Sequence, residues 1–259
     1  MKTFIGSVAA LSALLVTGCS TTYVAPSGRA DFSALVPQQA SVGALGDQPP
    51  GDLGTIGERA APTAVFPVGI AFARLQAPDY RSFSTDLNGG VYGTGRYSIF
   101  TTREVEDESD LQRLAGLPEM AGIVSLNRLL LPANLQTDAE LRRAAARLNA
   151  EMVVIYTFDT SFYDRNRSLT LMSLTLGNAR TQKVNLHVTA TALVLDTHTG
   201  FIYAAFETNE NQEFRTNVWK KEEHVDAARR NSERAAFKKL VTEFETAWPR
   251  IVERAKQGA

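Results

Sequence analysis

The segment LRRAAARLNAEMVVIY, residues 141–156, contains the change of period that decides the fold. Its first half spaces Leu and Ala residues at i, i+3, i+4 and i+7, which predicts a helix with one apolar face. Its second half opens the dense apolar run 152–158, which is typical of a buried strand. A helix that leads directly into a buried strand indicates an α/β domain.

Two capping-box patterns mark where helices are expected to begin. Thr137 is followed three residues later by Glu140, and Ser109 by Gln112. In this pattern the hydroxyl accepts a hydrogen bond from the third amide, while the Glu or Gln side chain reaches back to the cap residue. We therefore expect one helix directly before the decisive segment turns into a strand, and a shorter helix upstream.

Further apolar or alternating segments predict strands at 65–72, 97–105, 122–131, 168–176, 184–195 and 201–206. Asp196 to Gly200 is typical of a tight turn, which makes the last two strands a hairpin. An apolar stripe predicts a final helix over 222–247, and Pro249 is expected to kink or end it. The expected fold is a single α/β (α+β) domain of two or three layers, with a mixed sheet, a long β-hairpin and a C-terminal helix packed on it.

The composition excludes several classes of protein. The chain has 259 residues, 44% of them hydrophobic, and its 27 Lys and Arg against 28 Asp and Glu give a formal net charge of -1. These values are ordinary for a globular protein. They argue against a fully disordered chain and a strongly basic nucleic-acid binder, and the single Cys argues against a disulfide scaffold.

The N-terminus predicts an export signal. Lys2 supplies a positive charge, an uncharged and mostly apolar run follows over 4–16, and small residues lead to Cys19. This order is typical of a secretory signal peptide, and the run is too short for a membrane-spanning helix. We assign residues 1–18 to a signal peptide.

The residues Val16-Thr17-Gly18-Cys19 resemble the lipobox of bacterial lipoproteins. The resemblance implies cleavage before Cys19 and acylation of its thiol and its new amino group, by diacylglycerol and a further fatty acid such as palmitate. Ser20 follows the cysteine where an Asp would imply retention at the inner membrane. The expected location is therefore the outer membrane of a Gram-negative cell, with the domain facing the periplasm.

Residues 19–62 are expected to be a lipidated flexible tether, because Pro and Gly recur there without apolar periodicity. The alternative is an irregular but ordered arm that wraps the domain or a neighbouring subunit. The folded domain is expected to cover 63–259.

Two segments, 141–156 and 192–203, resemble the curli-secretion (CsgG-like) lipoprotein superfamily. The first is the helix that enters a buried strand, and the second is a strand, an Asp-x-x-x-Gly turn and a returning strand. The resemblance implies a CsgG-like periplasmic domain with a nonenzymatic, protein-binding role. Members form secretion channels, activate cell-wall synthases or belong to flagellar assemblies, so we expect an accessory or assembly factor for a secretion, cell-wall or surface-appendage machine in the cell envelope.

Two alternatives remain open. The hairpin 162–194 alternates apolar and polar residues and is long enough to cross a membrane, which would suit a homo-oligomeric secretion channel. A periplasmic hydrolase would need a catalytic set such as Asp159, Ser161 and His198, which the sequence does not bring together. We expect no enzyme activity, but an envelope protein partner and a membrane contact through the lipid.

Charge is uneven along the chain. Residues 103–119 contain six acidic residues and two Arg, whereas the final helix is basic. Its predicted outer face forms a possible docking face for an acidic protein, an anionic glycan or a lipid head group: Arg229, Arg230, Arg234, Lys238 and Lys239.

No metal or cofactor is expected. His187, His198 and His224 are not spaced as metal ligands. The Gly93-Thr94-Gly95 segment lacks the third glycine of a dinucleotide fingerprint.

Overall fold

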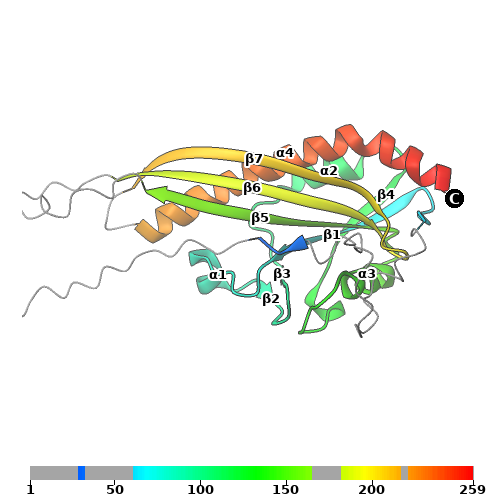
Figure 1. The fold of residues 1–259 in the computed structure, drawn as a ribbon, viewed down its shortest axis with the longest axis horizontal. Coiled ribbons are helices and arrows are strands. Elements are labelled where there is room, and N and C mark those ends of the chain that lie inside the picture. Colours follow the sequence, from blue (N-terminus) through cyan, green and yellow to red (C-terminus); the bar gives the residue numbers. More distant parts are fainter. Residues whose placement is uncertain (1–28, 33–60, 165–181, 217–220, 259) are drawn as a thin grey trace, which may run out of the picture.

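The computed structural model describes residues 29–32, 61–164, 182–216 and 221–258, which form an open mixed sheet with helices on both faces (Figure 1). The described strands are β1 (Val68–Gln76), β2 (Val91–Tyr92), β3 (Ser98–Phe100), β4 (Met120–Ser125), β5 (Met152–Asp164), β6 (Gln182–Asp196) and β7 (Ile202–Thr216). The described helices are α1 (Phe83–Asn88), α2 (Glu108–Ala115), the 3-10 helix η2 (Arg128–Leu130), α3 (Asp138–Arg147) and α4 (Lys221–Gly258). The expected α/β fold is confirmed: a mixed sheet, a long hairpin, and a C-terminal helix packed on it.

β1 lies at the centre of the sheet, with β5 parallel to it along one edge. Its other edge is shared by two strands. β4 pairs with its first half, where Phe72 lies opposite Ser125, and β3 pairs antiparallel with its end, where Arg74 lies opposite Phe100. The strand order therefore changes between these two positions, at the carboxyl end of β4.

β5, β6 and β7 form a long antiparallel meander that extends beyond the rest of the sheet (Figure 1). Burial alternates along β6: Leu186, Val188 and Ala190 are buried, and the residues between them are half-buried. These buried side chains belong to the apolar cluster that the sheet shares with α4, so the expected alternation of the strand is confirmed. β7 continues to Thr216, although the polar run 207–213 carries no strand pattern, because β6 pairs with it throughout.

α4 continues through Pro249 to Gly258, so the predicted end at 247 is wrong, and of the two alternatives at the proline the helix does not end there. Apolar residues on both sides of the proline hold the helix against the sheet, since Trp248 and Ile251 are buried. The Trp248 indole N–H also donates to the backbone carbonyl of Pro118 at 2.7 Å. This packing offsets the helical hydrogen bond that the proline ring removes.

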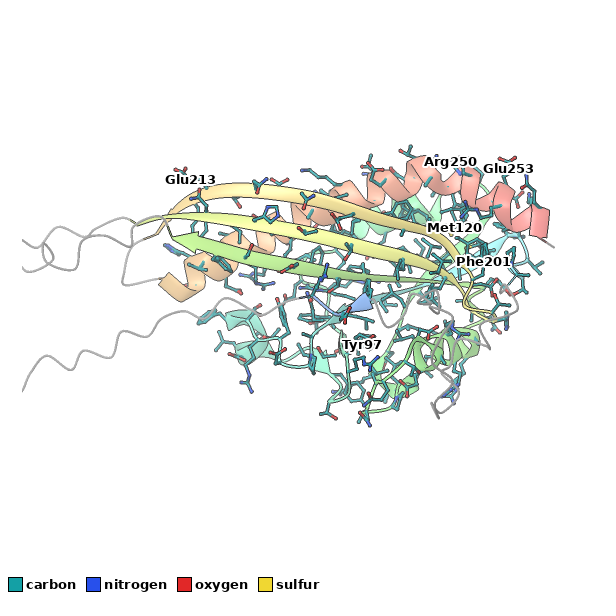
Figure 2. The ribbon with its side chains drawn as sticks, in the orientation of Figure 1. Tyr97, Met120, Phe201, Glu213, Arg250 and Glu253 are labelled. Carbon is teal, nitrogen blue, oxygen red and sulfur yellow. The ribbon has the colours of Figure 1, made fainter. Side chains whose placement is uncertain are left out.

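α3 packs on the opposite face of the sheet from α4, within a second apolar cluster. Its start is as expected, since the Glu140 carboxylate accepts a hydrogen bond from the backbone N–H of Thr137 at 3.1 Å. Asn149 follows the helix with a φ of 55°, a left-handed conformation that Asn adopts more readily than most residues. Figure 2 shows Tyr97 on this side of the sheet and Glu253 on the outer surface of α4.

The cap residue of α2 lies two residues before the predicted one, Ser109, so the predicted capping box is wrong. Asp107 is the cap residue, and both Ser109 and Gln112 lie inside the helix. The Asp107 carboxylate makes no capping hydrogen bond and instead lies 2.9 Å from the Lys238 ammonium of α4. The start of this helix is therefore accompanied by a charge contact with a distant segment. A local sequence pattern cannot predict such a contact.

The segment 29–32 lies against the domain, so the prediction of a flexible tether is wrong for these four residues. Arg29 forms an antiparallel bridge with Gln76 at the end of β1. Ala30 is 1% exposed, and its backbone N–H donates to Thr157 Oγ1 at 2.9 Å. The other predicted tether residues before position 61 lie outside the described part of the chain.

The turn between β6 and β7 is built around the buried carboxylate of Asp196, as the tight-turn pattern predicts. Its Oδ1 accepts from the backbone N–H groups of His198 at 2.9 Å and Thr199 at 3.0 Å. Its Oδ2 accepts from the Thr63 backbone N–H at 2.7 Å and from the Tyr203 hydroxyl at 2.8 Å. One side chain thus fixes both the turn and the beginning of the domain.

Candidate functional site

The five basic residues predicted to share a docking face on α4 do not lie together on the surface. Arg229 is 0% exposed, so its placement on an outer face is wrong. The other four side chains are 37% to 51% exposed: Arg230, Arg234, Lys238 and Lys239.

Each of the four exposed basic side chains has an acidic partner. The pairs are Arg230 with Asp226 (3.3 Å), Arg234 with Asp107 (3.3 Å), Lys238 with Asp107 (2.9 Å) and Lys239 with Glu210 (2.7 Å). The hydrogen bond and charge of Lys238 outweigh a small burial effect and lower the pKa of Asp107, which keeps this carboxylate ionised. The acidic segment 103–119 thus lies partly against the basic helix, and the two charge excesses offset each other.

Arg229 lies at the centre of a buried charged cluster between α4, α1 and the sheet. Its Nη1 donates to Glu233 at 2.7 Å and to the Tyr80 hydroxyl at 3.0 Å. Its Nε donates to Asp226 at 3.0 Å, and its Nη2 lies 3.3 Å from Glu104. Charges buried in this way are stable only when their hydrogen bonds are made, and each of the three guanidinium nitrogens of Arg229 makes at least one.

Arg74 of β1 extends the charged cluster into the sheet. Its Nη2 donates to Glu233 at 2.9 Å, and its guanidinium carbon lies 4.0 Å from the ring centre of Phe100 and 4.8 Å from that of Phe158. Its Nη1 lies 3.8 Å from Glu104, beyond hydrogen-bond distance. Among the described residues neither Nε nor Nη1 has a hydrogen-bond acceptor, although Arg74 is only 2% exposed.

The protonation states of the cluster follow from its charges. Burial lowers the pKa of Arg74 and Arg229, but the neighbouring acidic groups, above all Glu233, raise the pKa by more, so both guanidinium groups stay charged. Burial, with the Glu233 carboxylate, raises the pKa of Tyr80, which therefore keeps its proton.

A cleft of about 110 Å³ opens beside Arg74, where β1 changes its partner from β4 to β3. Polar side chains in its lining include Arg74, Thr102, Arg103, Glu106, Ser125 and Tyr156. In open α/β sheets, ligands bind in a crevice outside the carboxyl ends of strands, at a point where the strand order changes. The cleft has this position, since Ser125 is the last residue of β4.

Opposite charges face the cleft from different walls. The buried Tyr156 hydroxyl donates to Glu106 at 2.6 Å, and burial together with this carboxylate raises the pKa of Tyr156. Arg103 donates to Ser125 Oγ at 3.3 Å and forms an ion pair with Glu108, so it spans from its loop to the end of β4. The accessible charges of the cleft are therefore the Arg103 guanidinium and the Glu106 carboxylate, whereas the Arg74 side chain behind them is 1% exposed.

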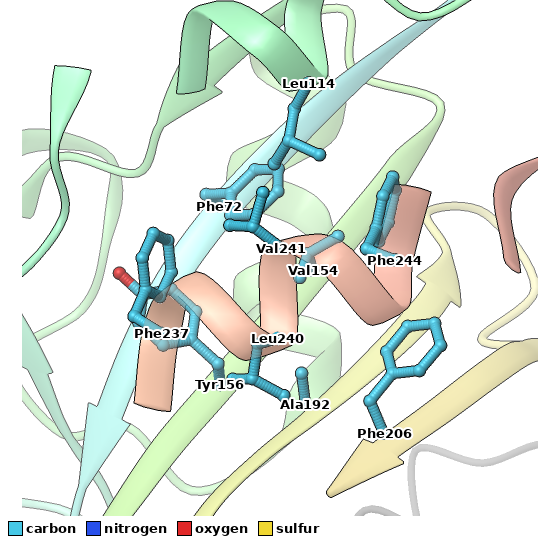
Figure 3. A pocket seen from close by; sticks show the side chains of 10 residues that line it. All are labelled: Phe72, Leu114, Val154, Tyr156, Ala192, Phe206, Phe237, Leu240, Val241 and Phe244. Atoms are coloured by element: carbon cyan, nitrogen blue, oxygen red, sulfur yellow. The ribbon is translucent and has the colours of Figure 1, made fainter. Parts of the chain in front are cut away.

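A second, apolar cavity of about 20 Å³ lies between α4 and the sheet (Figure 3). Its lining includes Phe72, Val154, Ala192, Phe206, Leu240 and Phe244. The space is sufficient for one water molecule at most, and the apolar lining offers almost no hydrogen-bond partners. We attribute this cavity to imperfect core packing and not to a substrate-binding site.

Filling this cavity is expected to stabilise the domain. The Ala192→Val substitution adds two methyl groups to a cavity-lining side chain of β6, and we expect a gain of about 0.5–1 kcal/mol in the free energy of unfolding. Urea unfolding of both proteins measures it. Thr191→Val on the opposite face of the same strand is the control and should leave the core unchanged. A loss of stability in Ala192→Val would show that the cavity does not accept the added volume.

The residues considered for a hydrolase are not brought together. Asp159 and Ser161 lie in β5, and Ser161 pairs with His187 of β6. His198 lies in the turn beyond Asp196, and the strand length between positions 187 and 196 corresponds to about 30 Å. Neither the Asp159 carboxylate nor the Ser161 hydroxyl can therefore reach the His198 imidazole within this sheet.

The remaining predictions concern a metal site, a membrane-spanning helix, Cys19 and the hairpin 162–194. Among the described residues, no group of three or more His, Cys, Asp or Glu is arranged to hold a metal ion. A search of the same residues finds no helix with the length and apolarity needed to cross a membrane. Cys19 and the middle of the hairpin 162–194 lie outside the described residues.

The sequence does not predict the charged cluster, because its pattern places Arg229 on the outer face of the final helix. One local signal exists on α4, where Asp226 and Glu233 stand three and four residues from Arg229. Another exists on β1, where Arg74 continues the alternation of Phe72 on the buried face. Neither signal says that these segments meet.

No family model and no curated relative matches this chain. The solved structures that align with it include the following two. One is a minor lipoprotein from Acinetobacter baumannii, 9% identical, with a TM-score of 0.29 over 72% of this chain and 94% of that chain. The other is described as a homolog of the neuraminyllactose-binding hemagglutinin, from Helicobacter pylori, 12% identical, with a TM-score of 0.34 over 78% and 94%. Alignments with these scores carry no argument about function, and neither description names curli secretion, so the CsgG-like resemblance stays a prediction.

Proposed function

We propose that this chain is a lipoprotein of the cell envelope whose periplasmic domain acts by binding, as an accessory or assembly factor. Its anchor is acylated Cys19, and its membrane is the outer membrane. One observation favours a binding domain over a channel. The apolar side of the hairpin is buried in the cluster that includes α4.

A strand that faces lipid must expose its apolar side chains to the bilayer. In β6 the corresponding residues are 0% to 1% exposed: Leu186, Val188 and Ala190. Their partners include Phe237 and Leu240 of α4 in the same cluster. Insertion of this hairpin would require α4 to leave the sheet and expose the core, which favours the binding role.

The binding role is also favoured over a hydrolase. The residues weighed for catalysis stand at distant points of the meander, whereas the charged cleft lies at the position where α/β sheets bind ligands. This arrangement supports recognition of a partner or ligand without requiring a reaction.

The first prediction of this proposal concerns the lipid anchor. The Cys19→Ala variant should be lost from the outer-membrane fraction, because two or more acyl chains are needed for stable anchoring and the variant has no thiol to acylate. Membrane fractionation followed by immunoblotting measures it. The control Ser20→Ala keeps the thiol and should partition with the outer membrane as the parent does. Equal partitioning of Cys19→Ala and the parent would contradict the anchor.

A further inference from the structure

We propose that the domain makes a second contact with the membrane, through a surface around Leu129 that binds anionic phospholipid head groups. This Leu129 surface is formed by the loop that contains η2 and by the exposed side of α3: Arg128, Leu129, Leu130, Pro132, Arg143 and Arg147. The inference rests on the proposed lipid anchor and adds that the domain itself docks on the bilayer.

The segment 29–32 keeps the anchor close to the domain. Arg29 forms a bridge with Gln76 at the end of β1, and Ala30 is buried, so the chain is fixed to the sheet at this point. Cys19 precedes Arg29 by ten residues. A chain of ten residues reaches at most about 35 Å when it is fully extended. The bilayer to which Cys19 is attached therefore lies within that reach of the sheet.

The same segment lies on the side of the sheet that carries the Leu129 surface. Ala30 belongs to the apolar cluster of α3, whereas α4 covers the opposite face (Figure 1). The Tyr97 hydroxyl donates to the backbone carbonyl of Asp31 at 3.0 Å. The Tyr97 backbone N–H donates to the carbonyl of Leu135 at 3.3 Å, just beyond the loop of the Leu129 surface. The connection to the anchor therefore begins near this surface, on the side of the sheet away from α4.

Leu129 is held out into solvent by a fixed turn. Its side chain is 84% exposed, the largest value among the exposed large apolar side chains of the described residues. Its backbone N–H donates to Asn127 Oδ1 at 2.9 Å, and Leu126 and Leu131 on either side are buried in the cluster of α3. Transfer of such a side chain from water to the acyl boundary of a bilayer is favourable.

The charges around Leu129 are complementary to anionic lipid. Arg128 and Arg147 are exposed, and in the part of the chain that the structure describes neither forms an ion pair. This contrasts with the exposed basic residues of α4, each of which has an acidic partner. Glu140 lies on the same surface, but its carboxylate accepts two backbone N–H groups at the start of α3. Protruding Leu with flanking Arg is typical of proteins that lie on a membrane interface.

Fluorescence quenching tests the proposal with the mature, lipidated full-length chain in vesicles that contain phosphatidylglycerol and a spin-labelled phospholipid. Cys19 is the only cysteine, and acylation blocks its thiol, so Leu129→Cys introduces a single site for a fluorophore. The probe at position 129 should be quenched by the spin-labelled lipid. Thr246→Cys, at an exposed position of α4, is the control and should stay unquenched.

Variants of the two arginines test the role of charge. One basic residue near an anionic bilayer contributes about fivefold to binding, so Arg128→Gln combined with Arg147→Gln should weaken docking by about 25-fold. Quenching measured over a range of phosphatidylglycerol contents shows this as a shift to higher content. Arg230→Gln combined with Arg250→Gln on α4 removes the same charge and should cause no shift. Unchanged circular dichroism spectra establish that the variants fold.

Three results would overturn the proposal: an unquenched probe at position 129, equal quenching at positions 129 and 246, or no shift in the Arg128 and Arg147 variant. Labelling of the parent chain at Cys19 would contradict the anchor, and this proposal with it. An unlabelled parent with an unquenched probe at 129 would contradict the docking surface alone.

Discussion

Replacing Arg229 with methionine is expected to lower the free energy of unfolding by about 3–5 kcal/mol, because removal of one member of a buried charged cluster leaves its partners uncompensated. Asp226 and Glu233 would lose a guanidinium that now lies within 3.0 Å of each. Methionine retains most of the volume of the side chain, so the loss measures charge and hydrogen bonding more than packing. Urea or guanidinium unfolding at neutral pH gives the value.

The neighbouring Arg230→Met variant is the matched control. Its side chain is 39% exposed, and its Nε lies 3.3 Å from Asp226 Oδ2 without forming a hydrogen bond, so its loss should cost about 0–1 kcal/mol. If Arg229→Met were as stable as Arg230→Met, the account of a structural charged cluster would be wrong.

The Asp196→Asn substitution is expected to cost about 2–4 kcal/mol, because the new amide group is a donor on the side where Thr63 and Tyr203 already donate. The other side keeps an oxygen for the backbone N–H groups of the turn. The effect should spread to the start of the domain at Thr63, which hydrogen exchange of that amide would detect. Asp86→Asn, at an exposed carboxylate of α1, is the control and should change stability by less than about 0.5 kcal/mol.

The Asp196 carboxylate should also make the stability of the domain depend on pH in the acidic range. Burial raises the pKa of Asp196, but the hydrogen bonds from Thr199, Thr63 and Tyr203 lower the pKa by more. Since the folded pKa lies below the unfolded value of about 3.9, the contribution of this group is present above pH 4 and is lost as the pH falls through the folded pKa. Thermal unfolding between pH 6 and pH 2.5 should show a smaller acid loss in Asp196→Asn than in the parent. Parallel curves would contradict this assignment.

Much of the fold follows from local patterns. The helix and strand of 141–156 form as the change of period predicts, and β6 buries alternate residues. Local rules fail where distant contacts act. Pro249 stays within α4 because Trp248 and Ile251 pack on the sheet, and 207–213 joins β7 because β6 pairs with it.

The candidate site is harder to predict from the sequence than the fold, because its residues also meet through contacts between distant segments. The sequence predicts Arg229 on the basic outer face of the final helix, as part of a possible docking face. Its burial depends on Glu104, Tyr80 and Arg74, which come from other elements. The cleft depends on two strands that share one edge of β1, and no spacing in the sequence predicts that break in the strand order.

The central claim, a domain that binds a partner in the envelope, is tested most directly by crosslinking in living cells. The tagged full-length chain is crosslinked, recovered from the outer membrane and analysed by mass spectrometry, with Cys19→Ala as the unanchored control. The account predicts a discrete foreign envelope protein that is crosslinked in the parent and reduced in the control. Crosslinks between copies of this chain alone would contradict the accessory role and favour a homo-oligomeric assembly.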